Sequence, residues 1–322
     1  MKLFSVSDNL AALMTKHNSG KLKLVIAFTT LYLVWGSTYL AIRIALETLP
    51  PFLMAGLRYV IASASLALFV PKKGWEKVTA THWKSAFIVG GFLFLGGNGG
   101  VVWSEQYVPS GITALIVATV PIWTVILEWR WMRKKRPDTL TLSGIILGFL
   151  GLWFLVSPSL THHAPIPLIG IVVLLCASLS WAIGSIMTRR VKLPSSWVLA
   201  SAMEMAAGGV WLFFLSFVSH DWQKIHSSII SFRSVAAVIY LVIFGALIGF
   251  TAYKYVLKNT SPTLSATYAY VNPVIAIFLG SAFAGEPLTM RVIFGAFIIL
   301  AGVFLITISK FSKAATSENI QA

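Results

Sequence analysis

The sequence predicts an all-α integral membrane protein whose ten transmembrane helices form two inverted five-helix repeats. Three observations lead to this prediction: the composition, the succession of apolar segments, and landmarks that recur in the second half of the chain. Of the 322 residues, 57% are hydrophobic and 11% are charged. A soluble domain usually carries about a quarter charged residues, so this chain has too few to cover a surface in water.

Ten apolar segments follow one another along the chain, and each is close to the ~20 residues that a helix needs to cross the hydrocarbon core. They are residues 24–45, 52–70, 86–104, 110–130, 140–156, 168–188, 197–218, 235–256, 263–282 and 290–308. We therefore expect a first repeat over residues 24–156, a connecting loop over residues 157–167, and a second repeat over residues 168–308.

The basic residues predict the orientation of the chain in the membrane. Twenty of the 25 Lys and Arg residues lie toward one side of the ten-helix arrangement, and Arg58 lies inside the second segment. The other side holds Arg43, Lys224, Arg233 and Arg291. Because basic loops stay in the cytoplasm, we expect cytoplasmic tails at residues 1–23 and 309–322. The apolar spacing of the first tail is compatible with a short helix on the membrane surface or with a disordered tail.

Prolines and tryptophans recur between the two halves. Pro121 and Pro273 lie 152 residues apart in the fourth and ninth segments, and Trp35 and Trp181 lie 146 apart. A five-helix unit has an odd number of crossings, so its second copy is inverted. A proline frees a helix carbonyl, which must face protein or a watery cavity rather than lipid. We therefore interpret Pro121 and Pro273 as hinges beside a transporter's central site.

Several classes of protein are disfavoured by the sequence. The net charge of +15 comes from short basic clusters between apolar segments, so we expect the lipid bilayer as partner and no nucleic acid. The single cysteine excludes an intrachain disulfide, and adjacent His162 and His163 are better explained as loop residues than as metal ligands. No nucleophile, cofactor or ATP-binding motif is visible, which disfavours an enzyme and a primary pump.

A polar stripe precedes Pro273 in the ninth segment. Ser265, Tyr268 and Asn272 recur at helical spacing, and polar groups inside a membrane need internal partners, so we expect them to face a cavity. Asn98 lies in a glycine-rich run of the third segment. That run either brings helices close together or presents the Asn98 amide to the cavity.

Aromatic residues of several segments are further candidates for a substrate cavity. They are Trp35, Tyr39, Trp103, Trp123 and Trp181. The alternative for each is an anchor at the membrane interface or a place in helix packing.

Two charges lie deep inside apolar segments, Arg58 in the second and Glu204 in the seventh. An unpaired charge at the membrane centre costs at least ~2.5 kcal/mol. Backbone carbonyls, polar neighbours or the other member of the pair could hold each charge. If Glu204 faces the cavity it could carry a proton, because burial raises a carboxyl pKa. The alternative is a purely structural ion contact.

The sequence resembles the drug/metabolite transporter (DMT) superfamily, specifically its EamA family of permeases, over residues 24–308. The resemblance is carried by Trp35-Gly36-Ser37, Ala55-Gly56-Leu57-Arg58, Pro121, Pro273, Gly285-Glu286-Pro287-Leu288-Thr289, Gly295 and Gly302. It implies a central cavity formed by helices 1, 3, 4, 6, 8 and 9. It further implies outward movement of small metabolites, often amino acids, across the bacterial inner membrane.

The same resemblance makes Glu286 a hinge residue, although an acid at a helix N-terminus is also stabilised by the helix dipole. The first half departs from the pattern, because Arg136-Pro137 stands where its hinge acid would be expected. The two hinges are therefore not expected to move alike.

The function expected from these features is secondary transport of a small organic metabolite. Apolar or aromatic amino acids lead, because the cavity candidates are aromatic and mostly neutral, and a proton or the substrate gradient could drive transport. One alternative is a bulkier nucleoside-like or cationic substrate, such as S-adenosylmethionine or a drug, which would favour Glu204 exposed in the cavity. A remote alternative is an intramembrane enzyme, which needs a polar catalytic cluster near one interface.

Overall fold

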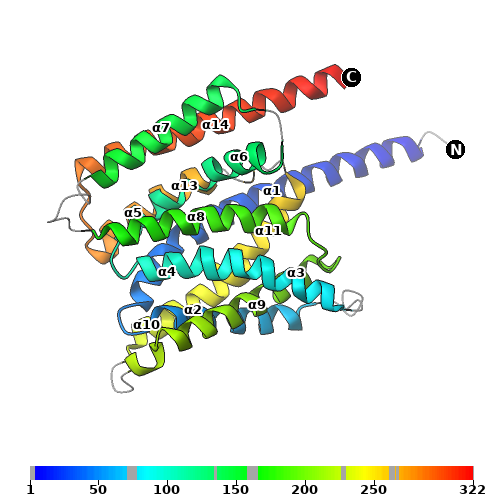
Figure 1. Ribbon diagram of the computed structural model, residues 1–322. Helices are drawn as coiled ribbons and strands as arrows, with labels where there is room; N and C mark the ends of the chain where they lie inside the picture. Colours follow the sequence, from blue (N-terminus) through cyan, green and yellow to red (C-terminus); the bar gives the residue numbers. More distant parts are fainter. Residues whose placement is uncertain are drawn as a thin grey trace.

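The computed structural model describes residues 4–70, 78–133, 136–157, 166–225, 230–260, 265 and 268–321, and for residues 4–21, 270 and 310–321 it describes the backbone alone. These parts of the chain are helical and contain no strand (Figure 1). Nine of their helices are long and apolar enough to cross a membrane, and a shorter apolar helix covers Val271–Ala284. The prediction of an all-α membrane protein is confirmed.

Five helical spans make up the first repeat. The first two are α1 (Phe4–Ala45) and α2 (Pro51–Leu68). The third consists of α3 (Ala80–Gly90), the π-helix η2 (Gly91–Gly99) and α4 (Gly100–Ser104). The fourth consists of α5 (Ser110–Val117) and α6 (Val120–Arg130), and the fifth is α7 (Thr139–Val156).

The second repeat has the same order of elements. It begins with α8 (Leu168–Thr188) and α9 (Trp197–Val218), followed by the short 3-10 helix η4 (Asp221–Lys224). The eighth span consists of α10 (Phe232–Tyr240), the π-helix η5 (Leu241–Ile248) and α11 (Gly249–Asn259). The last two spans contain α13 (Tyr268–Ala284) and α14 (Met290–Gln321).

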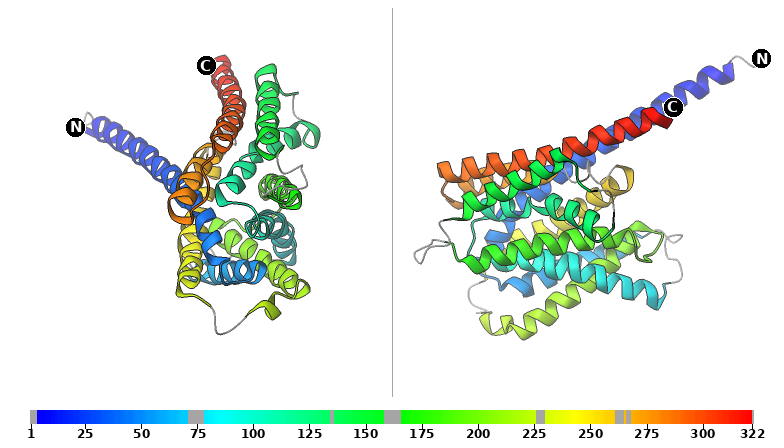
Figure 2. Two further views of the ribbon diagram at one scale, coloured as in Figure 1. Left: turned by 90° about the vertical axis from the view of Figure 1, so that its left-hand side faces the viewer. Right: turned by 45° about the horizontal axis from the view of Figure 1, so that its top comes forward.

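The terminal helices extend beyond the bundle. Helix α1 begins at Phe4 and α14 ends at Gln321, so each continues through most of the segment expected as a tail. Figures 1 and 2 show both ends leaving the bundle on the same side, as an even number of spans requires. The expectation of a separate surface helix or a disordered N-terminal tail is therefore corrected, because this segment prolongs the first span. We call the side of the termini the inner side and the opposite side the outer side.

The third and eighth spans share a feature that the sequence analysis did not predict. Both contain a π-helical stretch, and Gly99 of the one and Gly249 of the other lie 150 residues apart. A π-helix shifts the backbone hydrogen-bond pattern and is often found at functional sites. In η2 the Ser180 hydroxyl of α8 donates to the carbonyl of Phe92 at 2.8 Å. The repeat is therefore visible in backbone geometry.

Corresponding helices of the two repeats pack against each other. The most extensive contacts are those of α7 with α14 and of α2 with α9. Helices α7 and α14 lie side by side in both figures. A Cβ atom on Gly302 would lie 2.6 Å from the Gly148 nitrogen and 2.7 Å from the Gly144 oxygen. Such a close approach of two backbones tolerates no side chain, as expected where membrane helices pack through small residues.

The two central prolines occupy different local structures. In the fourth span the helix is interrupted at Ala118 and Thr119, and Pro121 follows in the first turn of α6. Proline fits there because the first turn of a helix needs no N–H donor. In the ninth span Pro273 lies inside α13. The predicted interruption is therefore present at Pro121, whereas α13 continues through Pro273.

Gly302→Ala is expected to lower the stability of the protein by about 1–3 kcal/mol, the usual effect of overpacking. In an isolated helix the same change would stabilise the helix by about 1 kcal/mol. A decrease in the free energy of unfolding would therefore indicate the close contact between α7 and α14. Thermal unfolding of the purified protein in detergent measures it. The matched control is Gly91→Ala, whose Cβ would come no closer than 3.5 Å to Trp211. An unchanged or raised Tm for Gly302→Ala would contradict the close approach.

Candidate functional site

A central cavity of about 80 Å³ lies between the two repeats. Its walls come from all six spans that the EamA resemblance implies and from the second span as well. The lining residues are Trp35, Thr38, Tyr39, Ile42, Arg58, Tyr59, Phe94, Gly97, Asn98, Val101, Val117, Val120, Ala177, Ser178, Trp181, Gly245, Ala246, Phe250, Tyr268 and Asn272. Pockets for drug-sized ligands measure about 300–1,000 Å³. The space in this conformation is therefore too small for such a ligand and has room for a few water molecules.

Six of the nine residues expected to bind substrate line this cavity. They are Trp35, Tyr39, Asn98, Trp181, Tyr268 and Asn272. They come from the first, third, sixth and ninth spans, which are far apart in sequence. Asn98 lies in η2, so both expectations for the glycine-rich run hold in part: its glycines pack against α8 and α9, and its amide reaches the cavity.

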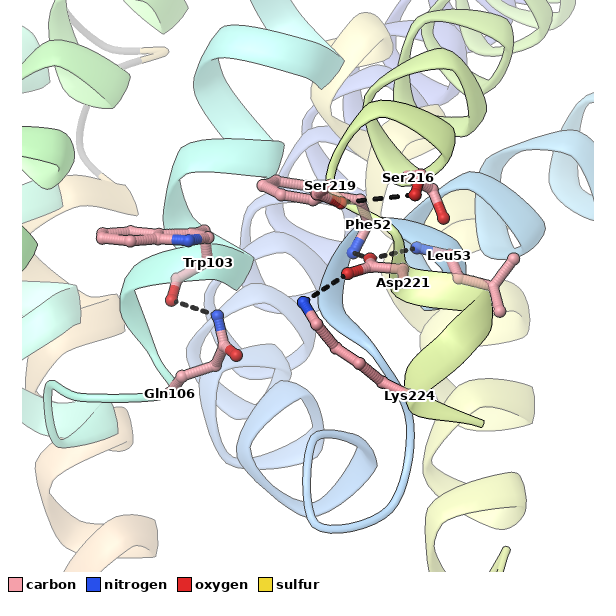
Figure 3. Close-up of polar contacts among 8 residues, drawn as sticks. All are labelled: Phe52, Leu53, Trp103, Gln106, Ser216, Ser219, Asp221 and Lys224. Atoms are coloured by element: carbon pink, nitrogen blue, oxygen red, sulfur yellow. Dashed lines mark hydrogen bonds and ion pairs between the residues drawn. The ribbon is translucent and has the colours of Figure 1, made fainter. Parts of the chain in front are cut away.

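The other three residues lie elsewhere. Trp103 packs on Tyr107 with ring centroids 5.2 Å apart, and its carbonyl accepts a hydrogen bond from Gln106 at 2.9 Å (Figure 3). Trp123 packs edge-on against Phe149 of α7 at 5.8 Å. The Ser265 hydroxyl lies 2.9 Å from that of Thr260. For the two tryptophans, helix packing is the role that the structure displays.

Four rings form what we call the aromatic cluster: Trp35, Trp181, Tyr253 and Tyr268. The centroid of Trp35 lies 5.6 Å from Trp181, 5.0 Å from Tyr253 and 5.3 Å from Tyr268. Edge-to-face pairs at such distances are favourable. Trp35 and Trp181 are corresponding residues of the two repeats, so their contact places the pseudo-two-fold axis between them, at the cavity.

The aromatic cluster separates the cavity from a second space of about 180 Å³ on the inner side, which we call the inner vestibule. Tyr253, Ser265 and Arg189 line the inner vestibule, and Tyr268 lines both spaces. Ser185 holds the Tyr253 hydroxyl at 3.1 Å. A solute passing inward from the cavity would have to displace these rings.

The broken fourth span supplies backbone polar groups to the cavity. Pro121 has no N–H to donate to the carbonyl of Val117, and Val117 lines the cavity. Helix α6 begins at Val120, which also lines the cavity, so the positive end of the helix dipole lies there. The C-terminal end of α5 and the N-terminal end of α6 thus meet at the cavity wall.

Asn272 links the ninth span to the first. When its amide is oriented by hydrogen bonding, the nitrogen donates to the carbonyls of Tyr268 and Tyr32, both at 3.2 Å. The residue is 3% exposed and lies immediately before Pro273. It therefore holds α13 against α1 at the cavity wall.

Arg58 is the one charged residue that the described structure places in the cavity wall. It is 4% exposed, and its Nε and Nη1 atoms have no hydrogen-bond partner among the described residues. The guanidinium carbon lies 4.8 Å from the centroid of the Tyr59 ring. Because arginine stays protonated in proteins, the cavity contains a buried positive charge with unused donors.

Glu204 is not paired with Arg58, which was one of the alternatives. Its Oε2 atom lies 2.8 Å from Nζ of Lys254, and the two side chains are 0% and 9% exposed. Lys254 also lies 5.2 Å from the centroid of the Phe250 ring. The sequence analysis counted Lys254 toward the basic side, near the end of the eighth segment; the structure places it within α11, buried against Glu204. Glu204 therefore has a structural ion contact outside the cavity wall.

Glu286 binds the first repeat rather than its own helix. Its two carboxylate oxygens accept hydrogen bonds from the Ser110 and Gly111 nitrogens, at 2.7 and 3.1 Å. These are free donors at the N-terminus of α5, where a carboxylate is favoured by both hydrogen bonding and the helix dipole. The preceding Gly285 has φ of +65°, which glycine adopts readily. The hinge loop of the second repeat thus caps a helix of the first.

The first half has an acid close to its expected hinge position, because Asp138 directly follows Arg136-Pro137. Asp138 caps α7 by accepting from the Thr141 nitrogen at 2.8 Å. The Ser309 hydroxyl of α14 donates to the same carboxylate at 2.6 Å. The acid lies just beyond the place where the resemblance put it, and it too joins the two repeats.

Asp221 provides a further link on the outer side. One carboxylate oxygen accepts from the Phe52 and Leu53 nitrogens, at 3.0 and 3.3 Å, and the other lies 3.0 Å from Nζ of Lys224 (Figure 3). It therefore caps the N-terminus of α2 from η4. Glu286 and Asp221 are both acids of the second repeat that fasten outer helix ends of the first.

Glu105 is a buried acid that the sequence analysis missed. It follows Ser104, the last residue of α4, and is 0% exposed, with no hydrogen-bond partner for either carboxylate oxygen among the described residues. Its backbone carbonyl accepts from Nη1 of Arg43 at 2.6 Å. Burial and the Glu286 carboxylate raise the pKa of Glu105 well above its usual range, against opposing effects of Arg43 and Arg58. In the sequence it looks like an ordinary loop acid.

Metal binding finds no support in the described residues, which contain no group of three or more His, Cys, Asp or Glu side chains able to hold an ion. The arrangement that does emerge is an internal cavity at the axis between two inverted helical repeats. This architecture defines a class of membrane transporters in which two halves rock about a central site.

The comparisons with known proteins agree with that class. The EamA-like transporter family matches residues 22–157 and 168–308, and the chain belongs to this family. The uncharacterized inner membrane transporter YedA of Escherichia coli strain K12 is 37% identical over 286 residues, which cover 88% of this chain and 90% of that protein. The transporter YoaV of Bacillus subtilis strain 168 is 26% identical over 293 residues, covering 90% and 98%.

The same fold occurs in a solved crystal structure with 19% sequence identity. The superposition has a TM-score of 0.64 and covers 89% of this chain and 97% of that one. Two separate matches to one family, one in each half of the chain, also accord with the internal repeat.

Removing one member of the buried Glu204–Lys254 pair is expected to destabilise the protein by about 3–5 kcal/mol, because an uncompensated charge stays buried. Glu204→Gln and Lys254→Met should each lower the Tm, and the double variant should recover most of the loss. The control is Arg233→Gln, whose exposed contact with Glu47 spans 3.6 Å, where about 0–1 kcal/mol is expected. Single variants as stable as the parent would contradict the buried pair.

Proposed function

We propose that this transporter exports small organic metabolites that carry a carboxylate and an apolar or aromatic body, with amino acids as the leading substrates. The observation that carries the proposal is the unpaired Arg58 guanidinium in an aromatic cavity. Two carboxylate oxygens match the parallel donors of a guanidinium, and such charge-assisted pairs are stronger than neutral hydrogen bonds. A buried cation without a partner is most readily compensated by an anionic ligand.

The rest of the cavity suits the other parts of an amino acid. Trp35, Trp181 and Phe94 offer ring surface for an apolar or aromatic side chain. The carbonyl of Val117 and the side-chain oxygens of the cavity are acceptors suitable for an ammonium group. A zwitterion would thus find a donor for its carboxylate, acceptors for its ammonium and apolar contact for its body.

A cationic substrate fits this cavity less well. Such a substrate would call for a carboxylate in the wall, whereas Glu204 is buried in a contact with Lys254 and Arg58 supplies a positive charge. Like charges in a low-dielectric site repel strongly. The charge of the cavity therefore favours zwitterions and anions over S-adenosylmethionine or a cationic drug.

Alternating access follows from the contacts on the two sides of the cavity. The aromatic cluster closes it on the inner side, and the caps made by Glu286 and Asp221 hold the outer ends of the helices together. A cavity of about 80 Å³ cannot admit an amino acid without movement of these parts. Rocking of the repeats about the Trp35–Trp181 contact would open one side at a time.

We assign the protein to the inner membrane, with both termini in the cytoplasm. The name of the similar YedA protein supports the membrane, and the excess of basic residues on the inner side supports the orientation. Outward transport is proposed because the EamA resemblance implies it.

Counterflow in proteoliposomes tests the substrate class. Vesicles preloaded with L-phenylalanine should accumulate labelled L-phenylalanine, and external phenethylamine, which lacks the carboxylate, should not compete. Arg58→Gln should lose about 10–100-fold in apparent affinity, the range for a hydrogen bond to a charged group, while Arg58→Lys should retain part of it.

Arg233→Gln is the matched control, because this arginine is exposed on the outer side. Competition by phenethylamine as strong as by the amino acid would reject a role for the carboxylate. A flat response across amino acids, with nucleosides or organic cations exchanged instead, would reject the substrate class altogether.

Topology is tested with reporter fusions. A reporter that is active only in the cytoplasm should be active when fused at either terminus, and inactive when inserted directly after Ile225, which follows η4 on the outer side. The physical reason is the inner excess of Lys and Arg, which resists translocation. Opposite results at the two termini would contradict an even number of spans.

A further inference from the structure

We propose that Glu105 is a proton-binding site at the outer closure of the transport path, holding a proton while that end is shut and releasing it to the outer solution when that end opens. By outer closure we mean Arg43, Glu105, Glu286 and the N-terminus of α5. The inference rests on the transport path of the proposed function but not on its substrate class.

The position of Glu105 is the first argument. Arg43, whose Nη1 atom lies 2.6 Å from the Glu105 carbonyl oxygen, lines two outer spaces of about 470 and 630 Å³. Tyr39 lies one helical turn before Arg43 on α1 and lines the central cavity. Glu105, which is 0% exposed, therefore lies where α1 and α4 meet, between the cavity and the outer spaces. Any opening of the outer side must expose it.

The surroundings of the carboxyl are the second argument. The charged groups acting on it are Arg43 of α1, Arg58 of α2 and Glu286 of the α13–α14 linker, and Tyr39 of α1 also faces it. Arg43 donates to the Glu105 backbone, and Glu286 is occupied by the amides of α5. Neither Glu105 oxygen has a donor among the described residues. A carboxylate buried in this way costs several kcal/mol, so the closed form favours the protonated acid.

Glu204, a buried acid near the corresponding position of the second repeat, provides the third argument by comparison with Glu105. Glu204 and Arg58 lie 146 residues apart, the offset of the two tryptophans, and Lys254 lies 150 residues after Ser104, the neighbour of Glu105. Glu204 of the second repeat therefore corresponds to Arg58 of the first, and Lys254 corresponds to Ser104, one residue before Glu105. Neither carboxylate has a hydrogen bond of good geometry among the described residues, but Glu204 has an ion-pair contact with Lys254 at 2.8 Å, whereas no such contact is present for Glu105. The unpaired acid is the one able to exchange a proton.

Opening of the outer side would favour the charged form of Glu105 over the protonated form. Water would then reach the carboxyl, and separation of α1 from α4 would free the Arg43 guanidinium from the Glu105 backbone. Both changes favour the charged form. One proton passes from a Glu105 carboxyl oxygen to water on opening, and it returns on closing.

The first experiment detects the bound proton directly, without any substrate. Infrared difference spectra of the purified full chain, taken between low and high pH, should contain a protonated-carboxyl band that persists above neutral pH and is absent in Glu105→Gln. Glu47→Gln is the matched control, because that carboxyl also lies on the outer side but is 44% exposed. A spectrum unchanged by Glu105→Gln would overturn the proposal.

The second experiment links the proton to opening. Ser104→Cys, at a position that is 0% exposed beside Glu105, is introduced with Cys176→Ser, and labelling by a membrane-impermeant thiol reagent is measured from the outer side. Labelling should rise with pH by up to about tenfold per unit more than in the same chain with Glu105→Gln, the slope for one proton. The thiolate fraction of the cysteine is measured in each chain and divided out, because the neighbouring Glu105 carboxyl changes the pKa of the thiol.

The outcomes of these experiments separate the two proposals. A ratio that does not change with pH would refute release on opening, even if the infrared band is present. Neither measurement depends on the substrate, so failed counterflow with amino acids would leave both results interpretable. A present band, a rising ratio and failed counterflow together would support Glu105 while rejecting the substrate class.

Discussion

The low dielectric of the membrane interior is the constraint on which this structure depends, because each buried charge must find a partner or remain neutral. Glu204 meets it with a lysine, and Asp221 and Glu286 meet it with the free amides at helix N-termini. Among the described residues, Arg58 and Glu105 are buried, have side-chain atoms without hydrogen-bond partners, and form no ion pair within 4 Å. The first lies in the cavity wall and the second where the outer side closes. In the part of the chain that the structure describes, these two charged groups thus lie at the central cavity and beside the outer spaces that Arg43 lines.

The two repeats share an architecture but use different chemistry at their ends. Both contain a π-helical stretch, and Trp35 meets Trp181 at the axis between them. On the outer side, acids of the second repeat cap helices of the first, whereas on the inner side rings such as Tyr253 and Tyr268 close the cavity. The hydrogen-bonded caps of the outer side can be replaced by contacts with water, whereas the aromatic rings of the inner side exclude water. A solute would therefore affect the two sides differently. Inversion of one ancestral unit thus yields two closures with different properties.

Much of the fold can be predicted from the lengths of the apolar segments alone. The length and spacing of the apolar segments predict the spans, because the thickness of the hydrocarbon core fixes how many residues a helix needs. The ends of the helices are less predictable, because polar residues can extend a helix beyond the lipid or be buried by a neighbour. Helix α11 continues to Asn259, beyond the predicted end at residue 256, for that reason, and α1 continues far outside the bundle. The π-helices have no sequence pattern that we recognised, since they depend on how neighbouring helices accept the shifted carbonyls.

For the site, the sequence by itself determined the membrane class, the duplication and the residues with unusual chemistry inside apolar segments, including Arg58 and the polar residues before Pro273. Only the tertiary structure decided which of these meet. It placed Asn98 and Tyr268 in one cavity, moved Trp123 into helix packing, and left Glu105 buried and alone. The physical reason is that the sequence of an apolar helix does not indicate which of its faces turns toward the other helices. Because most of its faces are lipid-compatible, the face that turns inward is set by packing between helices distant in the chain.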